Sequence, residues 1–312
     1  RKLVYADWLE EQDDARAMWV RELVTATETL GKTSALPKAG KYLDAWTNML
    51  GLPLYRGIQK FDLVGMKETV LRLARPIVTI KTKPTNEAKL AVGASKFGGH
   101  PDLSRDIIWP TFEMGPLGFL GQIALSDVKA TQAGRALPGD GLLSFFAYQN
   151  YNSGYQPGVG AKDARDTQVL YIPAGSALTR REPPEDLDAE GNAILPSCRL
   201  EMCEAWDLPS TEDRVALELQ THLKVFQNGN LRFQLHDCRS ECHRYGHHLM
   251  GYSLHGRRLD DPSPGIDWVH LLCLESDDNL GWSWCDGQHL AVFVHEAGLM
   301  KRRFGRVFGY AS

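Results

Sequence analysis

The sequence has few of the features that mark membrane, nucleic-acid-binding or disulfide-rich secreted proteins. No run of about 20 apolar residues occurs, so no membrane-spanning helix and no membrane partner are expected. Lys and Arg number 35 against 39 Asp and Glu, and a net charge of -4 argues against nucleic acid as a partner. The 6 cysteines are dilute in 312 residues, which favours buried, reduced thiols in a cytoplasmic protein over a disulfide framework.

Signatures of well-known catalytic sites are missing as well. The sequence contains no G-x-S-x-G nucleophile elbow, no H-E-x-x-H zinc motif and no phosphate-binding loop that ends in Gly-Lys-Ser/Thr. A hydrophobic content of 43% and a charged content of 24% are nevertheless those of a globular protein with an ample core. The composition therefore predicts a folded protein and leaves open whether it is an enzyme.

The first quarter of the chain has the patterning of helices. Apolar residues recur with helical spacing from about 13 to 31, with Asp13 or Asp14 as the expected cap. Two shorter helical patterns follow at about 40–50 and 66–75, and Pro76 ends the second of them. These patterns predict a helical N-terminal segment over 1–75.

Strand-like segments dominate the rest of the chain, beginning with the β-branched run at 77–80. Further strands are expected at 118–125, 141–148, 168–172, 199–205, 268–275 and 290–295. Loops rather than regular helices separate most of them, although one helix is expected within 211–226. This arrangement predicts an α+β fold in which residues 76–312 form a domain of antiparallel or mixed β-sheet with few helices.

The opening of the chain is similar to a small bacterial module. Residues 3–11 read Leu-Val-Tyr-Ala-Asp-Trp-Leu-Glu-Glu, and Asp14-Ala-Arg-Ala and Arg21-Glu-Leu follow. This string resembles the planctomycete "repeat-companion" domain over about residues 1–30. The resemblance implies a bacterial, planctomycete origin and no particular chemistry.

The rest of the chain, about 77–310, resembles a second family. The segments that carry the resemblance are Lys-Phe-Gly-Gly-His-Pro at 96–101 with Trp-Pro at 109–110, Phe-Leu-Gly-Gln-Ile-Ala-Leu at 119–125, Leu-Pro-Gly-Asp-Gly-Leu-Leu-Ser-Phe-Phe at 137–146, His-Leu-Met-Gly-Tyr at 248–252, and the runs at 271–277 and 304–307. Together they resemble the bacterial YwqG-like family, DUF1963, whose members have no agreed activity. Ser253 and Cys285 depart from the family pattern.

Glycines beside aromatic and polar residues in these segments indicate candidate positions for a ligand or partner cleft. The candidates are Lys96, Gly98, Gly99, His248, Gly251, Tyr252, Trp282, Trp284 and Asp286. For most of them a purely structural interpretation stays open. The turn at 96–99 either presents backbone N–H groups to an anion or simply reverses the chain, and His248 either acts as an acid or base or holds a turn. The two tryptophans either stack on a partner or pack onto the sheet.

Metal binding is not expected, and neither is any other cofactor. The run from 236 to 248 does contain thiols and imidazoles, and on a helix Cys238, Cys242 and His243 would lie near one another with His247 as a possible fourth zinc ligand. Their spacing is irregular and includes no Cys-x-x-Cys pair. This zinc site is kept only as an alternative.

Two functions are consistent with the sequence. The first is a cytoplasmic binding or protein-interaction module, for an unknown protein partner or small ligand. Some members of the resembled family lie near toxin–immunity genes, so the resemblance implies a role in toxin immunity as one form of it. The second is a hydrolase- or transferase-like enzyme with His248 as acid or base, Asp286 orienting it, and Lys96 or the Gly98 and Gly99 amides stabilising an anion.

Overall fold

The computed structural model divides the chain into two compact units. The first unit comprises Arg1–Pro76 and Glu204–Arg244, and the second comprises Ile77–Cys203 and Tyr245–Ser312. The sequence suggested one boundary, at Pro76, whereas in the structure the first unit also contains Glu204–Arg244. The residues that the structure describes are 1–148, 156–157, 165–187, 194–210, 230–243, 246–253 and 268–311. The helix expected within 211–226 lies outside them.

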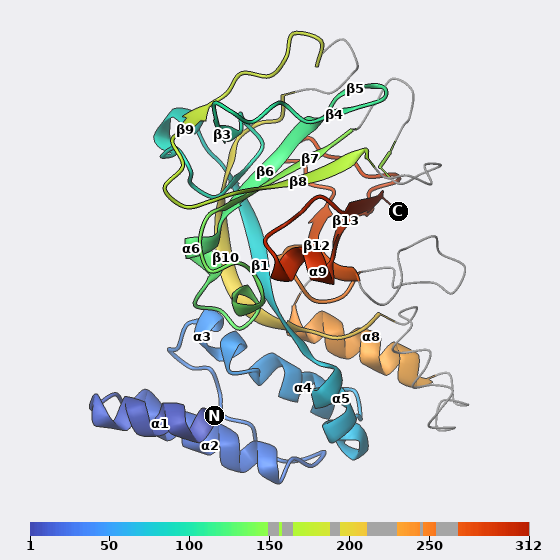
Figure 1. The fold of residues 1–312 in the computed structure, drawn as a ribbon. Coiled ribbons are helices and arrows are strands. Elements are labelled where there is room, and N and C mark those ends of the chain that lie inside the picture. The colour runs from blue at the N-terminus through green and yellow to red at the C-terminus, as the bar shows by residue number, and fades with distance from the viewer. Residues whose placement is uncertain are drawn as a thin grey trace. The chain divides into compact units, whose positions relative to one another are not determined.

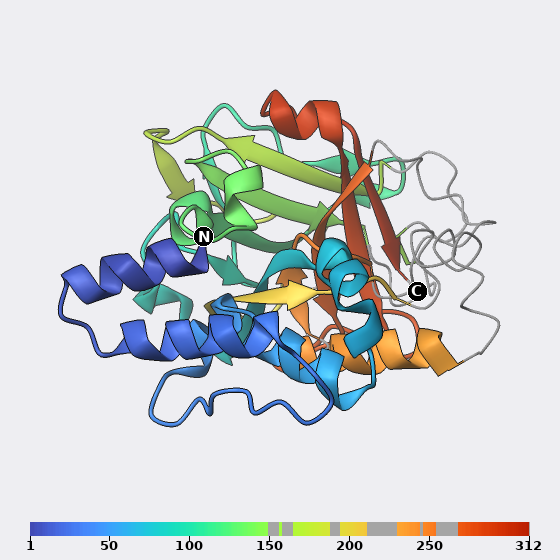
Figure 2. The same ribbon diagram turned by 90° about the horizontal axis from the view of Figure 1, so that it is seen from below.

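The first unit is helical. Its described elements are α1 (Lys2–Glu11), α2 (Arg16–Glu28), α3 (Asp44–Met49), α4 (Leu52–Lys60), the 3-10 turn η1 (Val64–Met66), α5 (Lys67–Leu73) and α8 (Asn230–Cys242). The helices α1 and α2 lie side by side (Figures 1 and 2) and bury Leu9, Val20 and Leu23 between them. Gly57 lets α4 approach α8 closely, because a Cβ at that position would lie 2.6 Å from Cys238 Sγ.

A large antiparallel sheet forms the second unit. Its order is β14-β13-β12-β11-β1-β10-β2-β6-β7-β8. The strands are β1 (Arg75–Pro84), β2 (Lys96–Phe97), β6 (Gly118–Ala124), β7 (Leu142–Ala147), β8 (Thr167–Ile172), β10 (Cys198–Asp207), β11 (His247–Leu249), β12 (Trp268–Glu275), β13 (His289–His295) and β14 (Val307–Ala311). The α+β fold expected from the sequence is confirmed.

Short elements connect or cover these strands. They are the two-stranded sheets β3 (Asp102–Ser104) with β9 (Leu178–Arg180) and β4 (Thr111–Phe112) with β5 (Gly115–Pro116), the helices α6 (Leu125–Val128) and α9 (Glu296–Met300), and the 3-10 turns η2 (Glu87–Lys89) and η3 (Gly134–Ala136).

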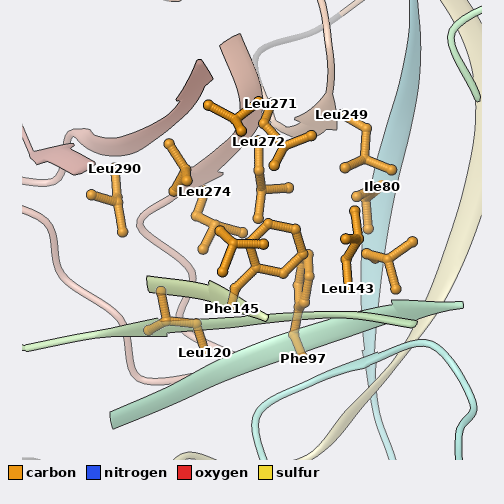
Figure 3. Close-up of a cluster of buried hydrophobic side chains, with 14 of the residues drawn as sticks. Ile80, Phe97, Leu120, Leu143, Phe145, Leu249, Leu271, Leu272, Leu274 and Leu290 are labelled. Atoms are coloured by element: carbon orange, nitrogen blue, oxygen red, sulfur yellow. The ribbon is translucent and has the colours of Figure 1, made fainter. Parts of the chain in front are cut away.

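The sheet curls so that its two halves share one core. Figure 3 shows Phe97 and Phe145 from β2 and β7 pointing toward Leu272 and Leu274 of β12. Every residue of β7 is buried, because a second apolar cluster that includes Trp109 covers the opposite face of that strand. A strand buried on both faces is mostly apolar rather than alternating, and Ser144 is the one polar residue of β7.

The curling brings together the two strands at the ends of the sheet. Gly309 of β14 lies against Thr167 of β8, so closely that a Cβ at Gly309 would overlap the threonine side chain. The described part of the sheet is therefore nearly a closed barrel, with β8 and β14 meeting at this point and not hydrogen-bonded as a strand pair.

Candidate functional site

Lys96 belongs to a cluster of charged and polar side chains on one face of the sheet of the second unit, named the Lys96 cluster below. The members come from η2, β2, the following turn, β3, β6 and β9, and they are Glu87, Lys96, His100, Asp102, Gln122 and Arg180. Two of the glycine–aromatic segments, at 96–101 and 119–125, meet here because Lys96 and Gln122 are cross-strand neighbours.

Two carboxylates hold the fully buried ammonium group of Lys96. Its Nζ donates a hydrogen bond to Glu87 Oε1 at 2.8 Å and lies 3.4 Å from Asp102 Oδ2. Asp102 in turn accepts hydrogen bonds from Gln122 Nε2 at 2.7 Å and from Arg180 Nε at 3.1 Å. Two cations and two carboxylates therefore balance one another where an unpaired charge would be costly.

Glu87 occupies the place that a bound anion would take in this turn. Its carboxylate accepts hydrogen bonds from Lys96 Nζ and from the backbone N–H of His100, both at 2.8 Å. Burial acts to raise the pKa of Glu87, but the hydrogen bonds from Lys96 and His100 outweigh burial and hold that pKa at about 2. The anion that this turn stabilises is thus a side chain of the protein itself.

The two glycines of the turn are required by their conformation and by close approach. Gly98 and Gly99 have φ of 65° and 68°, a left-handed region that other residues enter at a cost. A Cβ at Gly98 would overlap the Pro196 carbonyl group, and one at Gly99 would overlap Glu87. The N–H groups of both glycines donate to backbone carbonyls at 2.9 Å, so they are used within the fold.

The space beside the turn is small. Residues that include Gly99, His100, Trp109 and Phe119 surround a cavity of about 10 Å³. A volume of this size holds about one water molecule. Among the described residues, the Lys96 cluster therefore supports the fold of the second unit, and the cavity beside it is too small for a larger ligand.

His248 lies buried on β11, followed by a strained turn. Its Nδ1 is 2.9 Å from the Gly246 carbonyl oxygen, and its Nε2 is 3.4 Å from that of Tyr252. Met250 and Gly251 both have positive φ, at 65° and 85°, which is unusual for a methionine. These contacts agree with the structural interpretation of His248, in which its ring orients the turn at 250–252.

The tryptophan segment is divided between the core and the surface. Trp282 and Trp284 are 2% and 0% exposed and pack in the main core of the second unit. Asp286 is exposed, whereas His248 is fully buried. The nine candidate residues thus lie in three places, the turn at 96–99, the turn at 248–252 and the segment 282–286, and the two tryptophan rings are not available to a partner.

Asp277 forms a hydrogen bond with His247, the residue that precedes His248 on β11. His247 Nε2 lies 3.0 Å from Asp277 Oδ2, and Thr82 Oγ1 donates to the same oxygen at 2.6 Å. His247 Nδ1 accepts from the backbone N–H of Glu275 at 3.0 Å, so in the neutral ring Nε2 carries the proton given to Asp277. The hydrogen bond from His247 is the main reason that the pKa of Asp277 falls to about 2.

These residues do not form a nucleophilic triad with the nearby Cys198. Burial, with the charge of Asp277 adding to it, raises the pKa of the Cys198 thiol to about 11, so the thiolate is scarce near neutral pH. Both ring nitrogens of His247 are already used by Asp277 and the Glu275 amide. The arrangement therefore stabilises the β11–β12 region rather than activating a thiol.

Asp277 is expected to make the second unit sensitive to acid. Its folded pKa lies below the value of 3.8 for an ordinary aspartate, so its contribution is present above about pH 5 and is lost as the pH falls toward 2. We expect Asp277→Asn to lower the free energy of unfolding by roughly 2 kcal/mol at pH 7. Thermal unfolding at pH 7 and pH 3 checks this, since the gap between the two proteins should narrow in acid. A gap that is the same at both pH values would contradict it.

The residues of the alternative zinc site are engaged separately. Cys238 and Cys242 lie on α8 in the core of the first unit, where the adjoining thiol and burial raise the pKa of Cys242. His243 Nε2 lies 2.8 Å from Asp207 Oδ1, whereas His247 belongs to the second unit and contacts Asp277. No cluster of these four residues occurs in the described part of the chain.

A groove of about 510 Å³ lies in the second unit beside β8 and the start of β14. It is lined by Ile107, Arg165, Thr167, Gln168, Val169, Leu170, Tyr171, Arg302, Phe304, Gly305 and Val307. The sequence did not predict this groove. The meeting of two sheet edges depends on the tertiary fold, so no local pattern could indicate it. The basic run Lys-Arg-Arg at 301–303, which includes Arg302 of the groove, was the main signal in the sequence.

Comparisons with known proteins agree with the resemblance seen in the sequence. A family model described as "Domain of unknown function (DUF1963)" matches residues 95–310. No curated protein matches the sequence. Among the described residues, no helix is both long and apolar enough to cross a membrane.

Proposed function

The chain belongs to the DUF1963 family, for which no activity is known, so we propose its function from the geometry of the second unit. We propose that this unit is a binding module that takes up an extended peptide segment of a partner protein between β8 and β14. The observation that carries this proposal is the pair of sheet edges left unpaired among the described strands, β8 and β14, which touch at Thr167 and Gly309 and whose residues both line the groove. Sheet edges with open backbone groups bind extended peptides by strand addition.

The backbone of β8 turns alternate residues toward the groove. The backbone N–H of Tyr148 donates to the Asp166 carbonyl at 2.7 Å, so Asp166 and every second residue after it face β7. Thr167, Val169 and Tyr171 therefore direct their N–H and C=O groups away from β7. Thr167 lies against Gly309, which leaves the amide groups of Val169 and Tyr171 facing the groove.

The same alternation applies to β14. The backbone N–H of Ala311 donates to the Pro157 carbonyl at 2.9 Å, on the side of β14 that faces away from β13. Gly309 and Val307 consequently face that side too. An extended segment in the groove would thus find backbone partners at Val169 and Tyr171 on one side and at Val307 on the other.

The walls of the groove give the expected occupant its chemistry. Tyr171 and Val307 are partly exposed where they pack against the main core, so they offer apolar contacts to side chains of the segment, whereas Val169 is buried and contributes only its backbone. Arg165 and Arg302 line the groove, and no Asp or Glu does so among the described residues. Arg302 pairs with the exposed Asp140 at 3.3 Å, and such a pair is weak and exchangeable. The segment we propose is therefore extended, with apolar residues alternating with acidic ones.

A role in toxin immunity, which the family resemblance implied, would be one instance of such binding. The enzyme alternative has no comparable support, because His248 is fully buried and Asp286 is exposed. Trp282 and Trp284 have no part in the proposed binding, since their rings lie in the core.

For the N-terminal module, we infer that α1 and α2 form a repeat-companion-like helix pair. Arg21 lies 2.7 Å from Asp7 and 2.6 Å from Glu10, so residues of the resembled string link the two helices. These pairs are exposed and contribute little stability. The buried Leu9 and Leu23 of the same string supply the packing.

The proposal is tested with peptides whose sequences alternate Val with Glu or Val with Lys. We expect the intact chain to bind the acidic peptide, and Arg302→Glu to weaken binding by at least about 10-fold, which corresponds to about 1.4 kcal/mol. Val307→Pro removes an N–H that faces the groove and is expected to have a similar effect, since proline is tolerated where an edge strand's N–H faces outward.

Arg135→Glu is the matched control, because it makes the same charge change at an exposed residue outside the groove. Titration by calorimetry, together with a thermal-unfolding curve for each variant, measures the effect. Equal binding of both peptides, or binding that Arg302→Glu and Val307→Pro leave unchanged in folded protein, would refute the proposal.

A further inference from the structure

Three metal-ligand side chains outside the peptide groove converge within the second unit. They are His248 on β11 and His270 and Cys273 on β12, and one ligand atom from each lies within 4.8 Å of the others. All three residues are buried, at 0%, 4% and 0% exposed. We propose that these three residues form a zinc site.

A β-bulge creates this arrangement. His248 and Cys273 are direct partners across β11 and β12. His270 is three residues before Cys273, a spacing that in a regular strand would place the two side chains on opposite faces. The register of β12 shifts between His270 and Leu272, and the extra residue returns His270 to the face of Cys273. The ring contact between His248 and His270, with centroids 5.4 Å apart, follows from this shift.

Backbone carbonyl groups orient both imidazole rings in the manner of metal ligands. His248 Nδ1 is 2.9 Å from the Gly246 carbonyl oxygen, and His270 Nδ1 is 3.1 Å from that of Met250. A carbonyl oxygen only accepts, and the second carbonyl near His248, that of Tyr252, lies farther away, at 3.4 Å from Nε2. We therefore assign the proton of each neutral ring to Nδ1 and the lone pair to Nε2. Histidines that bind metals usually donate their other ring N–H to a carbonyl or carboxylate in this way.

The strained turn after β11 supplies one of these carbonyl groups. Met250 has φ of 65°, and its carbonyl is the one that contacts His270. A non-glycine residue in this conformation costs about 1–2 kcal/mol, and such strain is retained where the surrounding structure requires it. The strained conformation of Met250 places its carbonyl group where it orients the His270 ring.

The donor set fits zinc in both chemistry and size. Two imidazoles and one thiolate are typical zinc ligands, at about 2.0–2.3 Å from the ion, which places neighbouring ligand atoms about 3.4–3.8 Å apart in a tetrahedron. Separations of up to 4.8 Å need a contraction of about 1 Å, which side-chain rotation provides. Binding would release the Cys273 thiol proton to solvent, because the thiolate is the ligand. Three protein ligands leave a fourth position for water or another oxygen donor.

Cobalt(II) is the probe of choice, because its absorption reports tetrahedral geometry and a thiolate ligand while zinc itself is silent. The intact, metal-free chain is titrated with CoCl₂ and then with ZnCl₂. We expect one equivalent of cobalt to produce a thiolate-to-metal charge-transfer band and visible bands of tetrahedral intensity, and zinc to remove both.

Variants assign the ligands. Cys273→Ser is expected to abolish the charge-transfer band, and His270→Gln to weaken cobalt binding by at least about 100-fold, since even outer partners of a ligand are worth 10–100-fold. Cys285→Ser, which removes an exposed thiol, is the control and should bind as the original protein does. Cys238→Ser, which removes a thiol of α8, is a second control and should also bind cobalt as the original protein does.

Folding of each variant is checked by circular dichroism. A second measurement needs no variant: the rate at which Cys273 of the unaltered protein is alkylated, with and without zinc, shows whether the metal protects this thiol. Failure of the unaltered protein to bind cobalt would overturn the zinc site. So would a charge-transfer band that survives in Cys273→Ser or disappears in Cys238→Ser, and so would alkylation of Cys273 that excess zinc does not slow.

Discussion

Lys96→Met is expected to lower the free energy of unfolding by about 3–5 kcal/mol, one of the two largest effects in the protein. Lys96 is 0% exposed, and the change would leave the half-buried Glu87 and the fully buried Asp102 with one cation, Arg180, between them. In a unit of this size the loss corresponds to a fall in melting temperature of roughly 6–20 °C. Thermal unfolding followed by tryptophan fluorescence measures it, because Trp282 and Trp284 lie in the same unit.

Lys83→Met is the matched control for this change. Lys83 also pairs with a glutamate, Glu201, at 2.6 Å, but both side chains are substantially exposed, at 50% and 39%. Exposed pairs contribute at most about 1 kcal/mol. A double variant, Lys96→Met with Glu87→Gln, should recover part of the loss because it removes one of the unpaired charges. A loss below about 1 kcal/mol for Lys96→Met alone would contradict the description of the Lys96 cluster as a balanced, buried network.

Gly98→Ala is expected to cost at least about 3 kcal/mol or to prevent folding of the second unit. The residue has φ of 65°, and the added Cβ would overlap the backbone carbonyl of Pro196, which cannot move as a flexible side chain can. The cost of the positive φ and the cost of the overlap with Pro196 can be separated by substituting other glycines of the same unit. Gly175→Ala, with φ of 83° and no atom near the added Cβ, should cost about 1–2 kcal/mol.

Gly139→Ala completes this series, because Gly139 has neither a positive φ nor a neighbour within 4 Å. Its substitution should change stability by less than about 0.5 kcal/mol. Urea unfolding of the three variants gives their order. If Gly98→Ala proved no worse than Gly175→Ala, the close approach of the 96–99 turn to Pro196 would not exist in solution.

The strands were predictable wherever a segment was long and apolar. The expected strands at 118–125, 141–148 and 268–275 correspond to β6, β7 and β12 within about one residue at each end. By contrast, β2 and β11 are only two and three residues long and contain Lys96, His247 and His248. Such strands exist through their neighbours in the sheet, and no local pattern signals them.

The helix stop expected near residue 51 is confirmed, because α3 ends at Met49, but the sequence pattern missed the helix that begins at Leu52. The sequence pattern predicted a helix that ends before Gly51 and Pro53, since both residues often follow helices. In the structure Gly51 precedes α4 (Leu52–Lys60), and Pro53 lies in its first turn, where its missing N–H is harmless. Proline signals a helix boundary, and the direction of the boundary depends on which side has the apolar face. Here that face includes Leu54 and Ile58.

The candidate site was less predictable than the fold for a related reason. Glycine–aromatic segments indicate where backbones approach one another, and they do so at Gly98 and Gly121. Close packing of this kind lies in the interior, so the segments led to the core rather than to a surface. Both the groove and the proposed zinc site depend on sheet order and on one register shift, between His270 and Leu272, which long-range pairing alone determines.

Amide hydrogen exchange along β8 tests the peptide groove most directly, because it needs no knowledge of the natural partner. In the free protein, the amides of Gln168 and Leu170 face β7 and should be protected, while those of Val169 and Tyr171 should exchange at least about 100-fold faster. Addition of the acidic Val–Glu peptide should slow the exchange of the Val169 and Tyr171 amides in the original protein. In Arg302→Glu protein the peptide should leave these exchange rates unchanged. If all four amides are equally protected before any peptide is added, the edge of β8 is already paired and no groove is open for a partner.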